Sequence, residues 1–139
     1  VVPHMRERGW GRILTIGTNS VKQPHRKLPR AAQNTYRVGA LALSKTLSAE
    51  LGPFGITVNT LGTGAIATQQ FKTVFTKIAE SEGRTYEELV AARVAEWPVQ
   101  RMGTPEDMAA AAAFLCSTLA GYITVQVLVI DGGNLEALQ

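Results

Sequence analysis

Three short runs of apolar and β-branched residues recur along this chain, and each run ends in or next to glycine or a glycine-rich turn. They cover residues 12–17, 56–61 and 124–130, and long segments with helical spacing separate them. Polar residues do not alternate within the runs, which is typical of strands buried on both faces of a parallel sheet. The order strand, helix, strand, helix, strand therefore predicts an α/β fold, with helices covering a parallel sheet.

The segment 31–51 has the spacing of an amphipathic helix. Leu43, Leu47 and Leu51 recur every four residues, and no proline interrupts the segment. This period places the three leucines on one face. A Gly-Pro pair follows Leu51, and such a pair ends helices. We therefore expect one long helix between the first two strands.

Three more helices are expected between the second and third strands. Residues 66–97 hold two of them, separated near Gly83, and the second opens with capping-box spacing from Thr85. A Thr-Pro-Glu-Asp sequence from Thr104 begins the third helix, with threonine as the N-cap and proline at the first helical position. Gly121 is predicted to end that helix.

The predicted sheet is small. A doubly wound nucleotide-binding sheet has about six strands, and three are predicted here. No G-x-G-x-x-G follows a predicted strand, so the phosphate-binding turn of dinucleotide folds is absent from this sequence. The sequence has 139 residues and begins at Val1. We expect either a processed chain or a piece of a larger α/β domain.

Composition further restricts the class of protein to which this chain can belong. Hydrophobic residues make up 45% and charged residues 18% of the chain, which is the composition of a folded protein. The longest apolar run, residues 108–116, is far shorter than the roughly 20 residues that cross a bilayer. Cys116 is the single cysteine, and His4 and His25 stand alone. Neither a disulfide nor a metal site is expected, and a reducing, cytoplasmic setting fits best.

The amino-terminal quarter is basic. Residues 1–37 carry eight Lys or Arg against Glu7 alone, whereas residues 38–139 carry six basic and ten acidic groups. The densest part, residues 22–30, contains two prolines and no aromatic side chain. A solvated loop is favoured, because a nucleic-acid surface needs side chains that stack on bases. A phosphate-binding or nucleic-acid arm over residues 6–30 stays the minor alternative, and no membrane partner is expected.

Five segments occur in an order that carries more information than any one of them. They are PHMRERGWGRI (3–13), LSKTLSAEL (43–51), PFGITVN (53–59), RMGTPED (101–107) and YITVQVLVIDGG (122–133). Together they resemble the carboxyl-terminal half of a short-chain dehydrogenase/reductase, in particular a 3-oxoacyl-carrier-protein reductase. The resemblance implies that residues 1–139 form the carboxyl-terminal portion of a single Rossmann-like domain, a doubly wound parallel sheet with helices on both faces and lid helices at about 66–98.

The resemblance also implies a reaction, hydride transfer between NAD or NADP and a small-molecule carbonyl substrate such as a 3-oxoacyl thioester. The family places a serine after the first of these strands and Tyr-x-x-x-Lys on the following helix. The corresponding positions hold Thr18, Gln33 and Arg37. Threonine keeps a hydroxyl for the substrate oxygen, and arginine keeps a positive charge for the cofactor ribose. Glutamine cannot titrate, and arginine does not relay protons because its pKa lies above about 12.

Tyr36 is the alternative proton donor on the same helix. It lies three residues after Gln33, so the two side chains point in neighbouring directions. None of the three tyrosines has a lysine four residues later. Tyr36 therefore serves either as a displaced acid or as a helix-packing residue with its hydroxyl at the rim.

A second part of the implied site follows the strand at residues 56–61. The family folds a Pro-Gly pair and a following Ile-x-Thr over the nicotinamide, and here Gly64, Ile66 and Thr68 match while Thr63 replaces the proline. The alternative is a plain turn followed by the start of a helix. Three aromatic residues of the lid are candidate substrate contacts or core residues: Phe71, Phe75 and Trp97.

The changed motif leaves two functions open. One is an active reductase. The other is a catalytically silent relative that acts as a binding or assembly subunit. In either case the family implies a homo-oligomer, a dimer or tetramer, formed through the helix at residues 31–51 and the carboxyl-terminal helix and strand. A packed helix on its own sheet would explain the same apolar residues.

Overall fold

The computed structural model describes residues 1–24 and 31–136 and contains one three-stranded sheet. Its strands are β1 (Gly11–Thr18), β2 (Ile56–Thr63) and β3 (Val127–Ile130). Both pairings are parallel, in the order β1-β2-β3, with Gly11 opposite Ile56 and Thr60 opposite Val127. The predicted α/β fold with a parallel sheet is confirmed. Residues 25–30 of the basic segment, including His25, lie outside the described residues.

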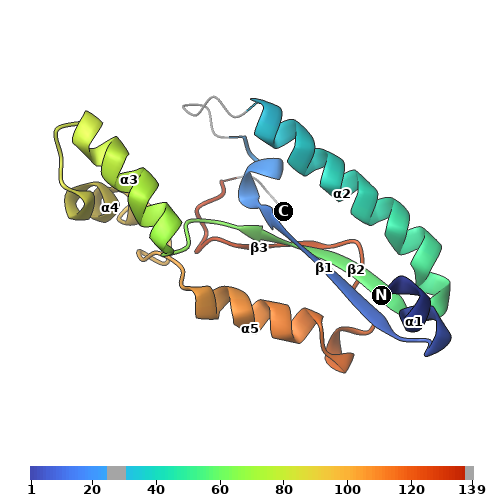
Figure 1. Cartoon of the computed structure of the whole chain (residues 1–139). Helices are drawn as coiled ribbons and strands as arrows, with labels where there is room; N and C mark the ends of the chain where they lie inside the picture. Colours follow the sequence, from blue (N-terminus) through green and yellow to red (C-terminus); the bar gives the residue numbers. More distant parts are fainter. Residues whose placement is uncertain (25–30, 137–139) are drawn as a thin grey trace.

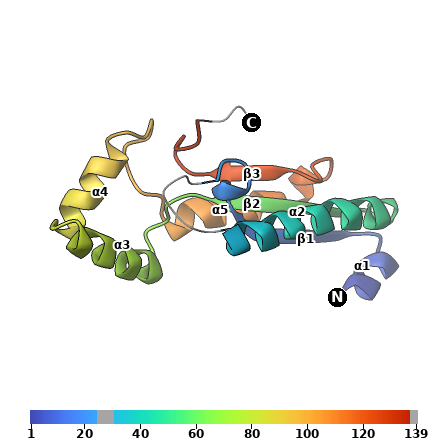
Figure 2. The same ribbon diagram turned by 90° about the horizontal axis from the view of Figure 1, so that it is seen from above.

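Helices lie on both faces of this sheet (Figure 1). They are α1 (Val2–Glu7), α2 (Ala31–Leu51), α3 (Gln69–Ser81), α4 (Tyr86–Val94) and α5 (Pro105–Leu115), with short 3-10 turns η1 (Asn19–Val21), η2 (Gly52–Phe54) and η3 (Thr118–Ala120). α2 covers one face and α5 the opposite face. α3 and α4 lie together beyond the end of the sheet where β2 leads into α3 (Figure 2).

Helix starts follow the local capping signals. Thr85 and Thr104 each accept a hydrogen bond from the backbone three residues later, and each forms a capping box with an acidic residue, Glu88 and Asp107 respectively. α5 ends at Leu115, before the predicted end at Gly121. The physical reason is a new turn, since the Ser117 hydroxyl caps η3 by accepting from the Leu119 N–H.

β1 extends one residue beyond its predicted bounds at each end, and two further strand boundaries differ from the prediction by two residues or more. β2 continues through Thr63, two residues beyond its predicted end at residue 61, because its pairing with β1 extends to Thr18. β3 begins at Val127 rather than at residue 124. Val125 adopts a positive φ of 63°, which breaks the extended conformation that a strand requires.

The core consists of two layers on either side of β2, whose residues are all buried except the last. On the α5 side, Leu61, Leu115 and Ala120 form a closed cluster. On the α2 side, Ile56 and Val58 are buried, and so are small serines of α2 such as Ser44. Small side chains at this contact let the helix lie close to the strand. In the two described ranges, no helix is long and apolar enough to span a bilayer.

Candidate functional site

The carboxyl ends of the three strands lie at one edge of the sheet, next to α3 (Figure 1). Open α/β sheets bind ligands at this edge, because the loops that follow the strands face one another there. The Thr63 hydroxyl donates to the Gly17 carbonyl across the strand boundary, at 3.0 Å. This bond ties the ends of β1 and β2, and it is what threonine adds at the position where the family has proline.

Thr18 ends β1 and begins a hydrogen-bond series through Ser20 to Asn34, two residues that the sequence did not indicate. Its Oγ1 lies 3.3 Å from the Ser20 Oγ, and the Ser20 hydroxyl donates to the Asn34 Oδ1 at 3.2 Å. Thr18 and Ser20 expose only 9% and 7% of their surfaces. Asn34 comes from the first turn of α2, which contacts η1. No local pattern predicts this contact, since it joins two elements across residues 25–30.

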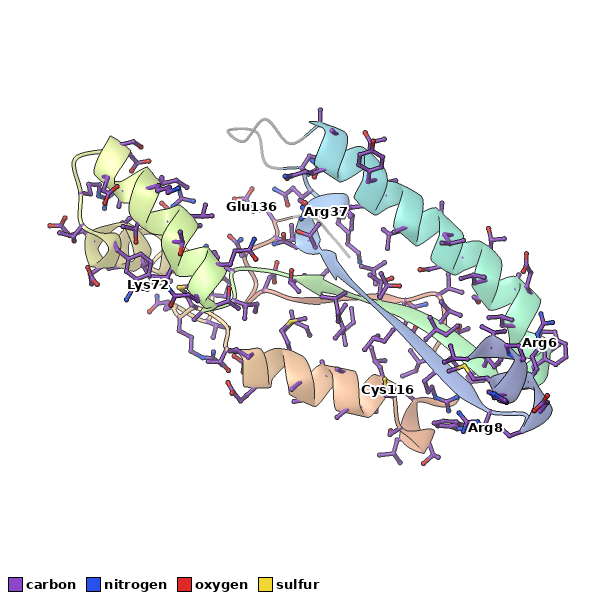
Figure 3. All side chains as sticks on the ribbon, viewed as in Figure 1. Arg6, Arg8, Arg37, Lys72, Cys116 and Glu136 are labelled. Atoms are coloured by element: carbon purple, nitrogen blue, oxygen red, sulfur yellow. The ribbon has the colours of Figure 1, made fainter. Side chains whose placement is uncertain are left out.

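Arg37 lies three residues after Asn34 on the half-buried side of α2. Its Nη1 is buried and has no hydrogen-bond partner among residues 1–24 and 31–136. Figure 3 shows the side chain at the end of the helix near η1. A guanidinium is always charged, and a buried N–H without an acceptor is costly. An oxygen of a ligand that reached this nitrogen would supply the missing acceptor.

Gln33 and Tyr36 lie outside the group of side chains just described near the end of β1. Gln33 is exposed, and Tyr36 exposes 79% of its surface. Of the four α2 and β1 residues that the sequence analysis singled out, the structure thus places Thr18 and Arg37 partly or fully inside the protein and leaves Gln33 and Tyr36 at the surface.

The loop after β2 packs tightly against the end of β3. The Gly64 N–H donates to the Ile130 carbonyl at 3.0 Å. A Cβ at Gly64 would lie 2.6 Å from the Asp131 Cα, so only glycine fits here without moving backbone. Ile66 pairs with Gly103 as an isolated bridge, and the Thr68 hydroxyl caps α3 by accepting from the Phe71 N–H. These three candidate residues hold the loop that a cofactor would contact.

Asp131 is a second site residue that the sequence analysis missed. Its carboxylate accepts hydrogen bonds from the Asn19 side chain at 3.3 Å and from the backbone N–H groups of Gly133 and Leu135 at 3.0 and 3.1 Å. It therefore joins the loop after β1 to the turn after β3. The signal available in the sequence was Asp-Gly-Gly directly after a predicted strand.

The segment before α5 binds the loop after β2 through backbone hydrogen bonds. The Gly103 N–H donates to the Ala65 carbonyl, and the Gly103 carbonyl accepts from the Ala67 N–H at 2.8 Å. Arg101 holds this segment through a two-point ion pair with Asp107, at 2.7 and 3.0 Å. The Arg101 hydrogen bond, followed by the Thr104 N–H, holds the pKa of the Asp107 carboxyl well below its usual range.

Two aromatic side chains of α3 stack on each other, and an arginine of α4 lies over one of them. The Phe71 and Phe75 rings stack with centroids 3.8 Å apart, and the Arg93 guanidinium lies 5.0 Å from the Phe75 ring centroid. Trp97 is half-buried just after α4. Phe75 therefore contributes to the contact between α3 and α4 through Arg93, whether or not a substrate reaches it.

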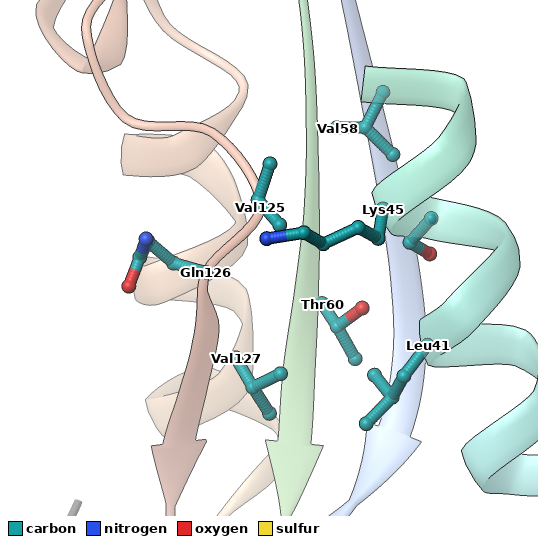
Figure 4. Close-up of a pocket in the computed structure, with 8 residues that line it drawn as sticks. Leu41, Lys45, Val58, Thr60, Val125, Gln126 and Val127 are labelled. Atoms are coloured by element: carbon teal, nitrogen blue, oxygen red, sulfur yellow. The ribbon is translucent and has the colours of Figure 1, made fainter. Parts of the chain in front are cut away.

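A groove of about 230 Å³ lies between α2 and the sheet, away from the carboxyl ends (Figure 4). Val58 and Thr60 of β2 and Val127 of β3 form its floor, and the Lys45 side chain of α2 reaches across it toward Val125. Half of its lining residues are aliphatic and half are polar or charged. Among the described residues, no three His, Cys, Asp or Glu side chains are grouped to hold a metal ion.

A parallel sheet covered on both faces, with hydroxyl, amide and guanidinium groups at its carboxyl edge, defines a Rossmann-like α/β protein. The family described as enoyl-(acyl carrier protein) reductase matches residues 1–134. The chain belongs to the short-chain dehydrogenase/reductase family.

Individual relatives agree with this assignment. The chain is 34% identical over 137 residues to nodulation protein G of Azospirillum brasilense, covering 96% of this chain and 49% of that protein. It is 31% identical over 138 residues to the 7alpha-hydroxysteroid dehydrogenase of Escherichia coli K12, covering 99% and 49%. The solved structure of L-sorbose reductase from Gluconobacter frateurii with NADPH and L-sorbose superposes with a TM-score of 0.88, at 30% identity, over 99% and 52%. The chain thus spans about half the length of these relatives.

The residues present fit one part of a nicotinamide dinucleotide. The buried, unpartnered Nη1 of Arg37 suits an oxygen of the ribose or pyrophosphate. The close-packed Gly64 leaves backbone rather than side chain at the adjacent loop. The glycine-rich turn that holds the pyrophosphate in dinucleotide folds does not occur in this sequence.

Proposed function

We propose that the protein transfers hydride between NAD(H) or NADP(H) and a small-molecule carbonyl substrate, in a site to which this chain contributes the carboxyl-terminal half. The observation that carries the proposal is the buried Nη1 of Arg37, which has no partner among the described residues at the carboxyl edge of the sheet. The solved relative with bound NADPH supports a nicotinamide cofactor. A 3-oxoacyl thioester is the finer proposal for the substrate, and it rests on the sequence resemblance.

The roles of this chain's residues follow from their chemistry. When bound, the cofactor supplies or accepts the hydride. Arg37 binds an oxygen of the cofactor and keeps its own proton. The backbone of the loop at Gly64, Ile66 and Thr68 orients the nicotinamide, and Thr18 contacts the substrate oxygen. Proton transfer is the weakest step, because the family's tyrosine position holds an amide.

Gln33 and Tyr36 complete the proposed site at its rim. Gln33 supplies hydrogen bonds to a substrate and no titratable proton. Tyr36 carries a phenolic hydroxyl that can donate a hydrogen bond, and its 79% exposure gives that hydroxyl direct access to water. We therefore expect slow turnover that rises with any change bringing an acid closer to Thr18.

The test is an equilibrium titration of the purified chain with NADPH and NADH. Saturable binding is expected for one or both. Arg37→Ala should weaken it by about tenfold or more, since a hydrogen bond from a charged donor is lost. Arg6→Ala, which changes an arginine of α1 that stacks on Phe54 at 4.5 Å, is the matched control and should leave the affinity unchanged. No saturation at millimolar cofactor, or an Arg37→Ala affinity equal to wild type, contradicts the proposal.

A silent binding or assembly subunit is the second candidate, and the residues at the tyrosine and lysine positions favour it. Gln33 and Arg37 keep hydrogen bonding and charge but not the usual proton transfer. Exposed apolar side chains lie on α2 and on the carboxyl-terminal part of the chain: Val38, Leu43, Phe114, Leu119 and Leu128. Such residues suit a homo-oligomer formed through these elements.

Turnover separates the two candidates. The silent subunit would bind cofactor or form a dimer or tetramer in analytical ultracentrifugation, without measurable reduction of any ketone. A reduction rate that is lost on Arg37→Ala would reject it.

A further inference from the structure

The three side chains Thr18, Ser20 and Asn34 form a hydrogen-bond series whose direction follows from counting protons. Ser20 has one hydroxyl proton, and that proton is donated to the Asn34 Oδ1 at 3.2 Å. The Ser20 Oγ also lies 3.3 Å from the Thr18 Oγ1. Because Ser20 has no second proton, Thr18 must be the donor in this contact.

The backbone adds to the same arrangement. The Ser20 N–H points to the Thr18 Oγ1 at 3.4 Å, so the threonine oxygen accepts there. Its proton is already committed to the Ser20 Oγ. Burial keeps water from competing, because Ser20 exposes 7% and Thr18 9% of its surface. What Thr18 has left for a ligand is a lone pair, not a proton.

We propose that Asn34 is a positioning residue that makes Thr18 a hydrogen-bond acceptor, so that the site preferentially binds a ligand hydroxyl, the alcohol form of the substrate, rather than a carbonyl oxygen. The inference rests on the proposed function for the contact between Thr18 and substrate. Asn34 itself need not touch the ligand. It acts through Ser20, whose proton it holds away from Thr18.

We expect a substitution at Asn34 to reverse the preference for an alcohol over a carbonyl ligand. In Asn34→Leu the Ser20 proton has no amide oxygen to bind and turns to the Thr18 Oγ1, which frees the threonine proton for a carbonyl oxygen. In Asn34→Asp a carboxylate oxygen replaces the amide oxygen, so the series keeps its direction. Thr35→Ala is the control for α2, because the Thr35 hydroxyl bonds only within the helix, to the Ala31 carbonyl at 3.0 Å.

The first measurement needs no ligand. Buried hydroxyl protons exchange slowly enough for NMR at low temperature, and their couplings to the β protons give the direction of each O–H bond. The expected result has the Ser20 O–H directed at Asn34 and the Thr18 O–H directed at Ser20. A Ser20 O–H directed at Thr18, or Asn34 amide protons bonded to the Ser20 oxygen, would overturn the proposal.

The second measurement uses cyclohexanol and cyclohexanone as probes, followed by chemical-shift changes at Thr18 and Ser20. Wild type, Asn34→Asp and Thr35→Ala should bind the alcohol about threefold to tenfold more tightly than the ketone, the worth of one hydrogen bond. Asn34→Leu should reverse the order. Equal binding of both probes, no binding of either, or an unchanged order in Asn34→Leu would overturn it.

These outcomes are distinguishable from failure of the proposed function. Loss of NADPH and NADH binding would remove the proposed reductase while the direction of the hydroxyl protons and the alcohol preference could still be measured. Cofactor binding with the reversed proton direction would remove this inference and leave the reductase proposal standing.

Discussion

Asn59 lies in the middle of β2 with 2% of its surface exposed, and both ends of its amide bind the segment before β3. Its Nδ2 donates to the Ile123 carbonyl at 2.8 Å, and its Oδ1 accepts from the Gln126 N–H at 3.0 Å. A buried side chain that replaces two backbone partners fixes the position of the chain that it binds. Asn59 therefore sets where β3 begins.

We expect Asn59→Ala to lower the free energy of unfolding by about 2 kcal/mol, because it leaves a part-buried carbonyl and a part-buried N–H without partners. Urea denaturation followed by circular dichroism measures this. Asn134→Ala, at an exposed position after β3, is the control and should change stability little. A loss at Asn59 no larger than in this control would show that water replaces both bonds.

Val125 is the residue with the clearest backbone strain. Its φ is 63°, in the left-handed region that a β-branched residue rarely adopts. Val125→Gly should raise the free energy of unfolding by about 1 kcal/mol, since glycine has no Cβ to clash there. Val127→Gly, two residues on and inside β3, should instead destabilise the protein. A lower thermal midpoint for Val125→Gly would mean that the valine side chain contributes more by packing beside the groove than it costs in strain.

At the scale of elements, the start of α5 holds the loop after β2 in place. Asp107 closes the capping box with Thr104 and binds Arg101, and the segment between them pairs with Ala65 and Ala67. Caps of this kind are local, which explains why the sequence predicts the starts of α4 and α5 correctly. The start of β3 depends on Asn59, a residue that lies far from it in the sequence, so the pattern of residues 124–130 alone placed it too early.

The Asp107 carboxyl gives the protein a pH-dependent contribution to stability. Its folded pKa lies below its unfolded value because of the Arg101 hydrogen bond. The carboxylate therefore stabilises the fold above the unfolded pKa, near 4, and this contribution is lost as the pH falls further. Asp107→Asn should lower the thermal midpoint at pH 7, and the difference from wild type should shrink as the pH falls below about 4.

Glu106→Gln is the matched control for this experiment, because Glu106 lies in the same first turn of α5. Its thermal midpoint should follow that of wild type at every pH. A difference between Asp107→Asn and wild type that stays constant down to pH 2 would contradict the assigned cause of the low pKa.

In the candidate site, the sequence indicates single residues more readily than the hydrogen bonds that join them. Thr18 and Arg37 were identified because they occupy the serine and lysine positions of the family that the sequence resembles. Ser20 and Asn34 were missed, because the hydrogen bond between them joins the turn after β1 to α2. The two residues lie 14 positions apart in the sequence. Asp131 was missed as well, because its role is to join loops that come together only in the folded sheet.

At the scale of the whole molecule, the chain is one sheet with a helix on each face and the pair α3 and α4 beside its carboxyl edge (Figures 1 and 2). β1 forms one edge of the described sheet, and its Ile16 is 63% exposed. Because the chain spans about half of the relatives it matches, we propose that its residues form one half of a cofactor site.

The most direct test of this half-site is a backbone NMR titration of the chain with NADPH and with NADH. We expect saturable shifts concentrated at the carboxyl edge, at Thr18, Arg37, Gly64, Ile66 and Thr68, with little change in the groove beside Lys45. Absence of saturation at millimolar cofactor, or shifts concentrated in the groove or on α1, would contradict a cofactor half-site at this edge of the sheet.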